Sequence, residues 1–185
     1  MKKSEKPKLF SCTLIFFSLS RLQNVARSQN PDVKVILSIG GWTDSSGDKY
    51  SRLVRDASKR RNFVAKVTKM LKTRGFDGLS LEWQYPVCWQ SNCKSGNAGD
   101  KQGFSKLVKE LSNAFKSGGL MLAASVSGYT DIADQAYDLG DLGKHLDMVN
   151  VMAYDYHGYW DKVTNYHSPL DKAPNSKNGK YYTVR

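Results

Sequence analysis

The sequence predicts an α/β fold in which helices cover a sheet of parallel strands. Four short apolar runs rich in β-branched residues alternate with longer segments whose apolar residues recur at helical spacing. This repeated alternation implies right-handed crossovers and therefore a parallel sheet. The chain has 185 residues, 40% of them hydrophobic, which suffices for one domain with a sizeable core. We therefore expect a (β/α) barrel or a doubly wound sheet.

The regular pattern begins after residue 30. Residues 33–39 (VKVILSI) form a β-branched apolar run that ends at Gly40, so they are expected to form a buried strand. Residues 48–74 have helical periodicity, in one or two pieces, and Gly75 follows at a plausible C-cap. Residues 76–83 are expected to form the second strand.

The second half of the chain repeats the alternation. Residues 86–101 are rich in Gly, Ser and Asn and are expected to form a loop. Residues 102–116 have helical spacing, and residues 120–126 (LMLAASV) form a third apolar run. A short helix is expected over 137–145, and a fourth strand over 147–154 (DMVNVMAY).

The number of strands bears on completeness. A full (β/α)8 TIM barrel takes typically about 250 residues. This chain supplies four strands, or five if residues 12–17 (CTLIFF) form one, and no clear period follows residue 161. We expect a partial barrel of four to five βα units, with open edges that would normally be paired. No G-x-G-x-x-G motif follows a strand, so dinucleotide binding has no support.

The N-terminal segment has two interpretations. Residues 1–20 join a basic start, MKKSEKPK, to the apolar run LFSCTLIFFSLS, whose length suits a signal peptide. Ser18 and Ser20 would then occupy the −3 and −1 positions of a cut after Ser20. Alternatively, residues 12–17 form a remnant barrel strand. In either case residues 21–185 form the domain. No apolar run approaches the roughly 18 residues of a membrane span.

The formal charge of +11 is concentrated in one segment. Residues 49–75 hold ten Lys or Arg and one acid, a net +9. Apolar residues at helical spacing in the same segment favour an amphipathic helix with a basic, solvated face. A surface for nucleic acid or another polyanion is the alternative. No nucleic-acid-binding motif supports it, and we expect no nucleic-acid partner.

The chain has three cysteines, Cys12, Cys88 and Cys93. A zinc site would need more ligands near the last two, and we expect neither a metal nor a cofactor. A disulfide between Cys88 and Cys93 fits better and would imply an oxidising compartment, although two thiols remain an alternative.

A polar row interrupts the second predicted strand. Because strand side chains alternate, Ser80, Glu82 and Gln84 share one face, and the apolar side chains between them share the other. In a barrel this polar face would line the interior and approach the C-terminal mouth, where active sites lie. Such a row requires either hydrogen-bonded partners or a function.

The stretch FDGLSLEWQYP (residues 76–86) resembles the signature strand of glycoside hydrolase family 18, the chitinases. The pattern of that strand is D-G-x-D-x-D-x-E followed by Tyr-Pro. Three further stretches match in order: SIGGW (38–42), AASVSG (123–128) and MVNVMAYDYHGYWD (148–161). The loop YPVCWQSNC with DKQGF (100–104) is most similar to the chitinase domains of large multidomain arthropod enzymes. Four ordered motifs are far more specific than any single one.

The resemblance implies substrate-assisted, retaining hydrolysis of β-1,4-N-acetylglucosamine linkages. In the family the last Glu of the motif protonates the glycosidic oxygen, and the N-acetyl oxygen of the sugar attacks the anomeric carbon. The Asp two residues earlier orients the acetamido group, and a Tyr of the M-x-Y-D strand also holds it. By position, this Tyr is Tyr154 here.

The motif departs from the family at three positions. Asp77 keeps the first Asp, whereas Ser80 and Glu82 replace the second and third. Gln84 replaces the catalytic Glu, and an amide cannot give up a proton at any useful pH. Glu82 lies two residues earlier, about 6.6 Å along a strand, so we expect it not to take over the acid's role.

Sugar binding could outlast the loss of chemistry, because Gln is nearly isosteric with Glu and still forms hydrogen bonds. The expected sugar-binding residues are Trp42, Tyr85, Met152, Tyr154 and Asp155. Further aromatic residues at or near strand ends are candidates for stacking, although packing is at least as good an explanation for each: Trp83, Trp89 and Trp160.

The sequence thus predicts a secreted chitinase-like protein that binds chitin or N-acetylglucosamine oligomers without normal hydrolysis. One alternative is a family 18 chitinase with residual activity. The other is a non-enzymatic signalling or interaction protein on the same scaffold, since fold does not fix function.

Overall fold

The computed structural model describes residues 10–162, 164–171 and 183–184. Its centre is one parallel sheet of four strands in the order β1-β2-β3-β4. The strands are β1 (Ile36–Gly40), β2 (Gly78–Glu82), β3 (Met121–Ser127) and β4 (Met148–Met152). The helices are α1 (Phe10–Gln29), α2 (Lys49–Arg55), α3 (Ala57–Arg74), α4 (Gly99–Lys116), α5 (Thr130–Ala136) and α6 (Leu139–Leu142).

The four predicted strands and the break in the first long helical segment are confirmed. Asp56 separates α2 from α3 and caps α3, because its carboxylate accepts hydrogen bonds from the amides of Ser58 and Lys59. Gly75 ends α3 in the left-handed conformation, with φ 69°. Helix α3 is amphipathic as expected, with Val67 and Leu71 buried and most of its basic residues exposed.

One alternative for the N-terminal segment is wrong, and one helix was not predicted. Residues 12–17 belong to helix α1 and form no barrel strand. A short apolar run cannot distinguish strand from helix by periodicity alone, and this one continues into a polar helical segment. Helix α5 was not predicted, and only part of the helix expected over 137–145 forms, as α6. The signal-peptide interpretation stays a prediction, since residues 1–9 lie outside the described residues.

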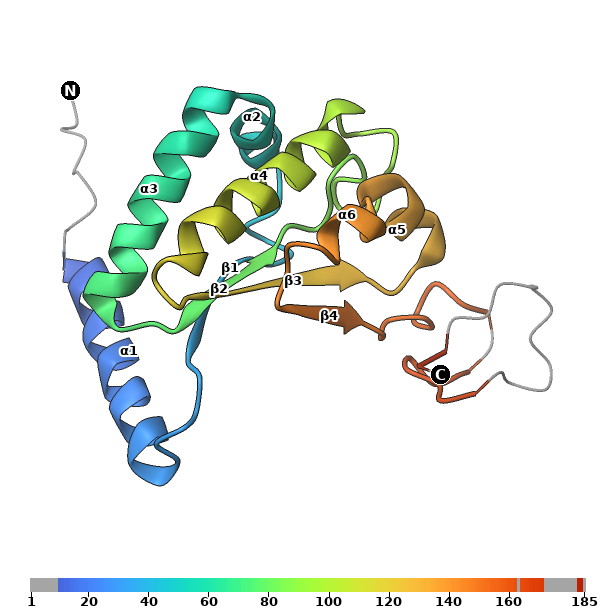
Figure 1. Ribbon diagram of the computed structural model, residues 1–185. Coiled ribbons are helices and arrows are strands. Elements are labelled where there is room, and N and C mark those ends of the chain that lie inside the picture. The colour runs from blue at the N-terminus through green and yellow to red at the C-terminus, as the bar shows by residue number, and fades with distance from the viewer. Residues whose placement is uncertain (1–9, 163, 172–182, 185) are drawn as a thin grey trace, which may run out of the picture.

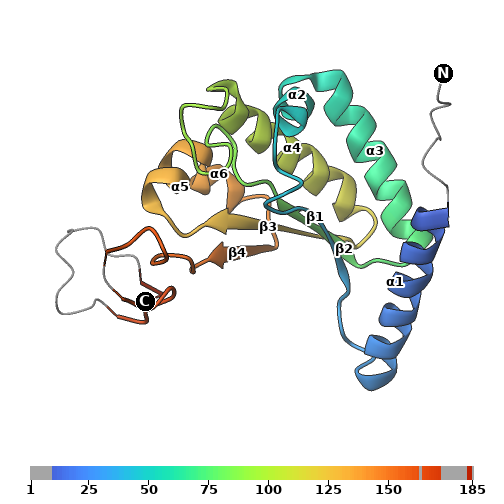
Figure 2. The ribbon, with the colours of Figure 1, turned by 180° about the vertical axis from the view of Figure 1, so that it is seen from behind.

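The two faces of the sheet differ. Figures 1 and 2 show α2 to α6 gathered on one face, whereas α1 stands apart beside the segment that enters β1. Leu79 and Leu81 point toward the helices and are buried, while Ser80 and Glu82 lie on the opposite, helix-free face and are half-buried. The predicted alternation is therefore confirmed, and the polar row faces the side that a closed barrel would enclose.

The sheet is open at both edges within the described residues. Strands β1 and β4 each pair with one neighbour there. Val149 and Val151 of β4 remain 44% and 58% exposed, although the facing residues of β3, Ala124 and Val126, are buried. The described chain thus forms three βα units and a fourth strand of the expected barrel, and the apolar surface of that last strand is only partly covered.

Two aspartates hold the amino ends of the strands together. Asp77 Oδ2 accepts hydrogen bonds from the Val35 amide (2.7 Å) and the Arg27 guanidinium (2.8 Å). Asp147, which precedes β4, forms a similar contact with β3, because its Oδ2 accepts a hydrogen bond from the Leu122 amide (2.7 Å). Asp77 therefore ties β2 to the segment before β1 and to α1, at the end of the strand away from Gln84.

This role of Asp77 predicts a pH-dependent contribution to stability. Burial acts to raise the pKa of Asp77, but the hydrogen bonds from Val35 and Arg27 outweigh it and hold the pKa below its usual value. A lowered folded-state pKa stabilises the fold above the unfolded pKa, and this contribution is lost as the pH falls through the folded pKa. Asp77→Asn should therefore lower the free energy of unfolding at pH 7 by about 1 kcal/mol.

The difference in free energy of unfolding between the wild type and Asp77→Asn should decrease as the pH falls from 5 to 3. Urea unfolding at each pH measures it. Asp32→Asn, in the exposed turn before β1, is the matched control and should leave stability within about 0.5 kcal/mol. A difference that stays constant over this range would contradict the assignment.

Candidate functional site

A cavity of about 420 Å³ lies at the carboxyl ends of β2 and β4. Its lining consists of Trp42, Gln84, Tyr85, Ser91, Tyr129, Met152, Tyr154, Asp155 and Trp160. The structure thus brings together Gln84 and all five residues expected to bind sugar, from three separate segments of the chain. A pocket at the carboxyl ends of parallel strands is where α/β proteins place their ligands.

Close backbone contact fixes the first wall of the cavity. Gly40 ends β1 with φ 115°, and a Cβ at this position would lie 2.2 Å from the carbonyl oxygen of Glu82. The amide of Gly41 donates to the same oxygen at 2.8 Å. Ser45 donates to it through Oγ (3.3 Å) and accepts a hydrogen bond from the Gln84 amide (2.9 Å). The loop that carries Trp42 is therefore held against the end of β2.

Gln84 is buried, and its amide group has defined partners. Nε2 donates to Oε1 of Glu82 at 3.0 Å and to Sδ of Met152 at 3.3 Å. The side chains of Glu82 and Gln84 thus meet despite the separation of their backbones along the strand. Both hydrogens of the amide are directed to these acceptors, so Oε1 of Gln84 is the atom left for a ligand. Glu82 acts in this contact as an acceptor.

Two tyrosines beside this pair are held in the protonated state. Burial raises the pKa of Tyr154, and the nearby Glu82 and Asp155 raise it further. Burial also raises the pKa of Tyr85, which Tyr154, Asp155 and Glu82 reinforce and a hydrogen bond with Ser127 opposes. Both phenols therefore keep their protons at neutral pH and can donate hydrogen bonds into the cavity.

Other predicted residues lie outside the cavity. Ser80 is on the same face of β2 as Glu82, two residues earlier in the strand. Asp77, which the family resemblance includes among the catalytic positions, lies at the amino end of β2 and is not among the residues that line the cavity, so a catalytic role for it stays a prediction.

The aromatic candidates divide into two groups. Trp42, Tyr85, Tyr154 and Trp160 line the cavity, and Trp42 keeps half of its surface exposed. Trp83 is 3% exposed, and its ring packs against Tyr50 and Phe104. Trp89 donates through Nε1 to Asp100. The last two tryptophans are structural, so position at a strand end did not suffice to identify a binding residue.

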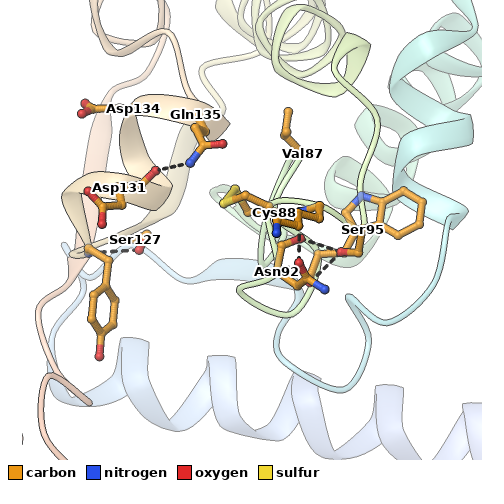
Figure 3. Close-up of a disulfide and its surroundings, with 12 residues drawn as sticks. Val87, Cys88, Asn92, Ser95, Ser127, Asp131, Asp134 and Gln135 are labelled. Carbon is orange, nitrogen blue, oxygen red and sulfur yellow. Dashed lines mark hydrogen bonds between the residues drawn. A yellow bond between two sulfur atoms is a disulfide. The ribbon is translucent and has the colours of Figure 1, made fainter.

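A disulfide-closed loop forms the wall after β2. Cys88 and Cys93 are bonded, as predicted. Figure 3 shows this loop beside the segment that leads from Ser127 into α5. Val87, Gln90 and Ser91 have φ values of 63°, 49° and 65°. The left-handed region costs a residue with a side chain about 1–2 kcal/mol, so this loop requires firm anchoring.

Asp100 provides that anchor. Its carboxylate is fully buried at the first turn of α4 and accepts four hydrogen bonds. The donors are Ser51 Oγ (2.6 Å), Trp89 Nε1 (3.0 Å), the Asn97 amide (3.2 Å) and the Val87 amide (3.4 Å). Sequence reasoning did not assign roles to Asp100, Ser45, Ser91 or Tyr129, because their partners come from distant segments and no periodicity marks them.

The family model for glycosyl hydrolases family 18 matches residues 6–185, nearly the whole chain. The chain belongs to glycosyl hydrolase family 18. "Probable chitinase 10" of Drosophila melanogaster is 44% identical over 160 residues, which are 86% of this chain and 7% of that protein. The family prediction is thereby confirmed, and so is the barrel fold of which this sheet is a part.

Solved structures agree with this assignment. Catalytic domain 2 of the group II chitinase of Ostrinia furnacalis, as a mutant in complex with penta-N-acetylchitooctaose, is 43% identical with a TM-score of 0.82. The match covers 95% of this chain and 44% of that one. Human YKL-39, described as a pseudo-chitinase with retained chitooligosaccharide binding properties, is 30% identical with a TM-score of 0.77, over 91% of this chain and 46% of that one. The chain therefore spans less than half the length of these relatives.

Two further searches concern only the described residues. Within 10–162, 164–171 and 183–184, no group of three or more His, Cys, Asp or Glu side chains is placed to hold a metal ion. None of the helices in that part of the chain combines the length and apolar character needed to cross a membrane.

The contact between Gly40 and Glu82 predicts a measurable difference between two glycines. Gly40→Ala adds a methyl group where 2.2 Å is available beside backbone, and also strains a positive φ. It should lower the free energy of unfolding by about 3 kcal/mol or more. Gly47→Ala is the matched control, because Gly47 also has a positive φ (78°) but nothing lies within 4 Å of its added Cβ.

Gly47→Ala should cost about 1 kcal/mol from backbone strain alone. Urea unfolding of both variants separates the steric contact from the strain. Equal losses would show that the close approach at Gly40 does not matter to stability.

Proposed function

We propose that this chain is a chitinase-like protein that binds N-acetylglucosamine oligomers in the cavity and does not hydrolyse them. The observation that carries the proposal is the amide of Gln84 at the position where the family motif has its acid. An amide cannot transfer a proton to a glycosidic oxygen at neutral pH. General acid catalysis typically contributes about 10²–10⁴-fold to such a reaction.

Glu82 is the side chain nearest to a substitute for this acid. Its Oε1 lies 3.0 Å from Nε2 of Gln84 and accepts that hydrogen bond. It is absent from the residues that line the cavity, whereas Gln84 is among them. Ser80 and Glu82 replace the second and third Asp of the family motif. The acetamido group of the sugar is therefore less well oriented to act as the nucleophile.

The groups that remain suit sugar binding. Trp42 offers a half-exposed flat ring, on which the apolar face of a sugar can stack. Tyr85 and Tyr154 supply phenolic donors, and Asp155 and Oε1 of Gln84 supply acceptors. The description of human YKL-39 as a pseudo-chitinase that retains chitooligosaccharide binding supports this combination in a relative. The disulfide supports our proposal that the protein is secreted into an oxidising compartment.

Binding is tested by isothermal titration calorimetry with a hexamer of N-acetylglucosamine. Trp42→Ala and Tyr154→Ala should each weaken binding by about tenfold or more, because each removes an aromatic face of the cavity. Tyr166→Ala is the matched control, since Tyr166 is 80% exposed and lies outside the cavity. Absence of binding by the folded wild-type chain would refute the proposal.

Hydrolysis is tested separately by release of reducing ends from the same oligomer. We expect no release by the wild type above the rate without protein. Release by the wild type that disappears on Glu82→Gln would overturn the non-hydrolytic assignment and identify Glu82 as the acid.

A further inference from the structure

Gln90 contacts both walls of the cavity. Its backbone amide donates to the carbonyl of Gln84 at 3.2 Å, and its Nε2 donates to the carbonyl of Trp42 at 2.7 Å. Gln84 and Trp42 come from the ends of different strands, β2 and β1. One residue of the disulfide-closed loop therefore connects the backbone of Gln84, at the centre of the site, to the backbone of Trp42, whose exposed ring lies at the rim.

The loop around Gln90 is held from both sides. The disulfide between Cys88 and Cys93 brackets Gln90 in the sequence. Beneath it, the buried carboxylate of Asp100 accepts from Nε1 of Trp89, the residue immediately before Gln90. Movement of the loop would break a buried, charge-assisted hydrogen bond, so the position of Gln90 is well determined.

The backbone dihedral angles of the loop indicate that the surrounding contacts determine its conformation. Gln90 and Ser91 both lie in the left-handed region, which side-chain-bearing residues rarely adopt. Such conformations persist where the surrounding structure determines them, and they concentrate at ligand sites. Ser91 itself lines the cavity. The covalent link and the Asp100 contact are two of the constraints that maintain it.

We propose that Gln90 is a positioning residue, which holds the Trp42 ring in the orientation on which a sugar stacks. Because the Cys88–Cys93 disulfide holds the loop of Gln90, the orientation of the Trp42 ring then depends on whether this disulfide is oxidised or reduced. The inference rests on the proposed function for its ligand. A dithiol supplies the two electrons and two protons, becomes a disulfide itself, and leaves the thiols of Cys88 and Cys93. Cys93 is half-buried whereas Cys88 is fully buried, so the attack falls on the sulfur of Cys93.

The sharpest variant is Gln90→Glu. It keeps the size of the side chain and the backbone bond to Gln84, but places an acceptor opposite the Trp42 carbonyl, which cannot donate to it. We expect a five- to tenfold loss of affinity for the N-acetylglucosamine hexamer, and a similar loss in Gln90→Ala. Gln135→Ala is the matched control, because Gln135 lies on α5 and its Nε2 donates to the Asp131 carbonyl away from the cavity. Unchanged affinity in both Gln90 variants would overturn the proposal.

A second readout needs no sugar. The indole N–H signal of Trp42 in a ¹H–¹⁵N spectrum, assigned by its loss in Trp42→Phe, should shift or broaden in Gln90→Glu and after treatment with dithiothreitol. It should stay unchanged in Gln135→Ala. If the wild type binds no sugar, the proposed function fails while this measurement still tests the positioning. A Trp42 signal that is indifferent to both Gln90→Glu and reduction would exclude the role of the loop.

The double variant Cys88→Ser, Cys93→Ser provides the same test without a reductant, so that any effect of the reductant on other parts of the protein is avoided. Circular dichroism establishes that this double variant is folded before its spectrum is compared. A folded double variant with the wild-type Trp42 signal would remove the disulfide from the proposal.

Discussion

The site depends on how closely the carboxyl ends of β1 and β2 approach each other. Only a hydrogen fits between Cα of Gly40 and the Glu82 carbonyl, and that carbonyl also accepts hydrogen bonds from Gly41 and Ser45. This one oxygen therefore fixes the chain direction after both strands. The strands cannot separate at this point. Trp42, after β1, and Gln84, after β2, are therefore both directed to the cavity.

Much of this arrangement follows from short-range pattern in the sequence. The period of two over residues 78–82 places Leu79 and Leu81 under the helices and Ser80 and Glu82 on the other face, since strand geometry admits no alternative once one face is buried. Gly40 and Gly75 each mark a positive φ, and each ends an element as expected. These features are local, so the sequence alone can predict them.

The features that escaped prediction join distant parts of the chain. Asp100 accepts a hydrogen bond from Ser51, which lies 49 residues earlier, and Gln90 donates one to Trp42, which lies 48 residues earlier. Such pairs have no period, and an Asp at the start of a helix suggests a helix cap before it suggests a buried anchor. The strand interpretation of residues 12–17 failed for a local reason, because the apolar pattern of this run is compatible with both helix and strand.

Under the proposed function, the amide of Gln84 changes more than the capacity to transfer a proton. The family's acid must present a donor to the glycosidic oxygen, which can only accept. Here both Nε2 hydrogens point to Glu82 and Met152, so the group presented to a ligand is an acceptor. Two acceptors facing each other give no hydrogen bond, whereas a sugar hydroxyl can donate to Oε1. On our proposal, an amide at this position therefore disfavours the contact that precedes bond cleavage and retains one that binding can use, because Glu82 fixes the orientation of the amide.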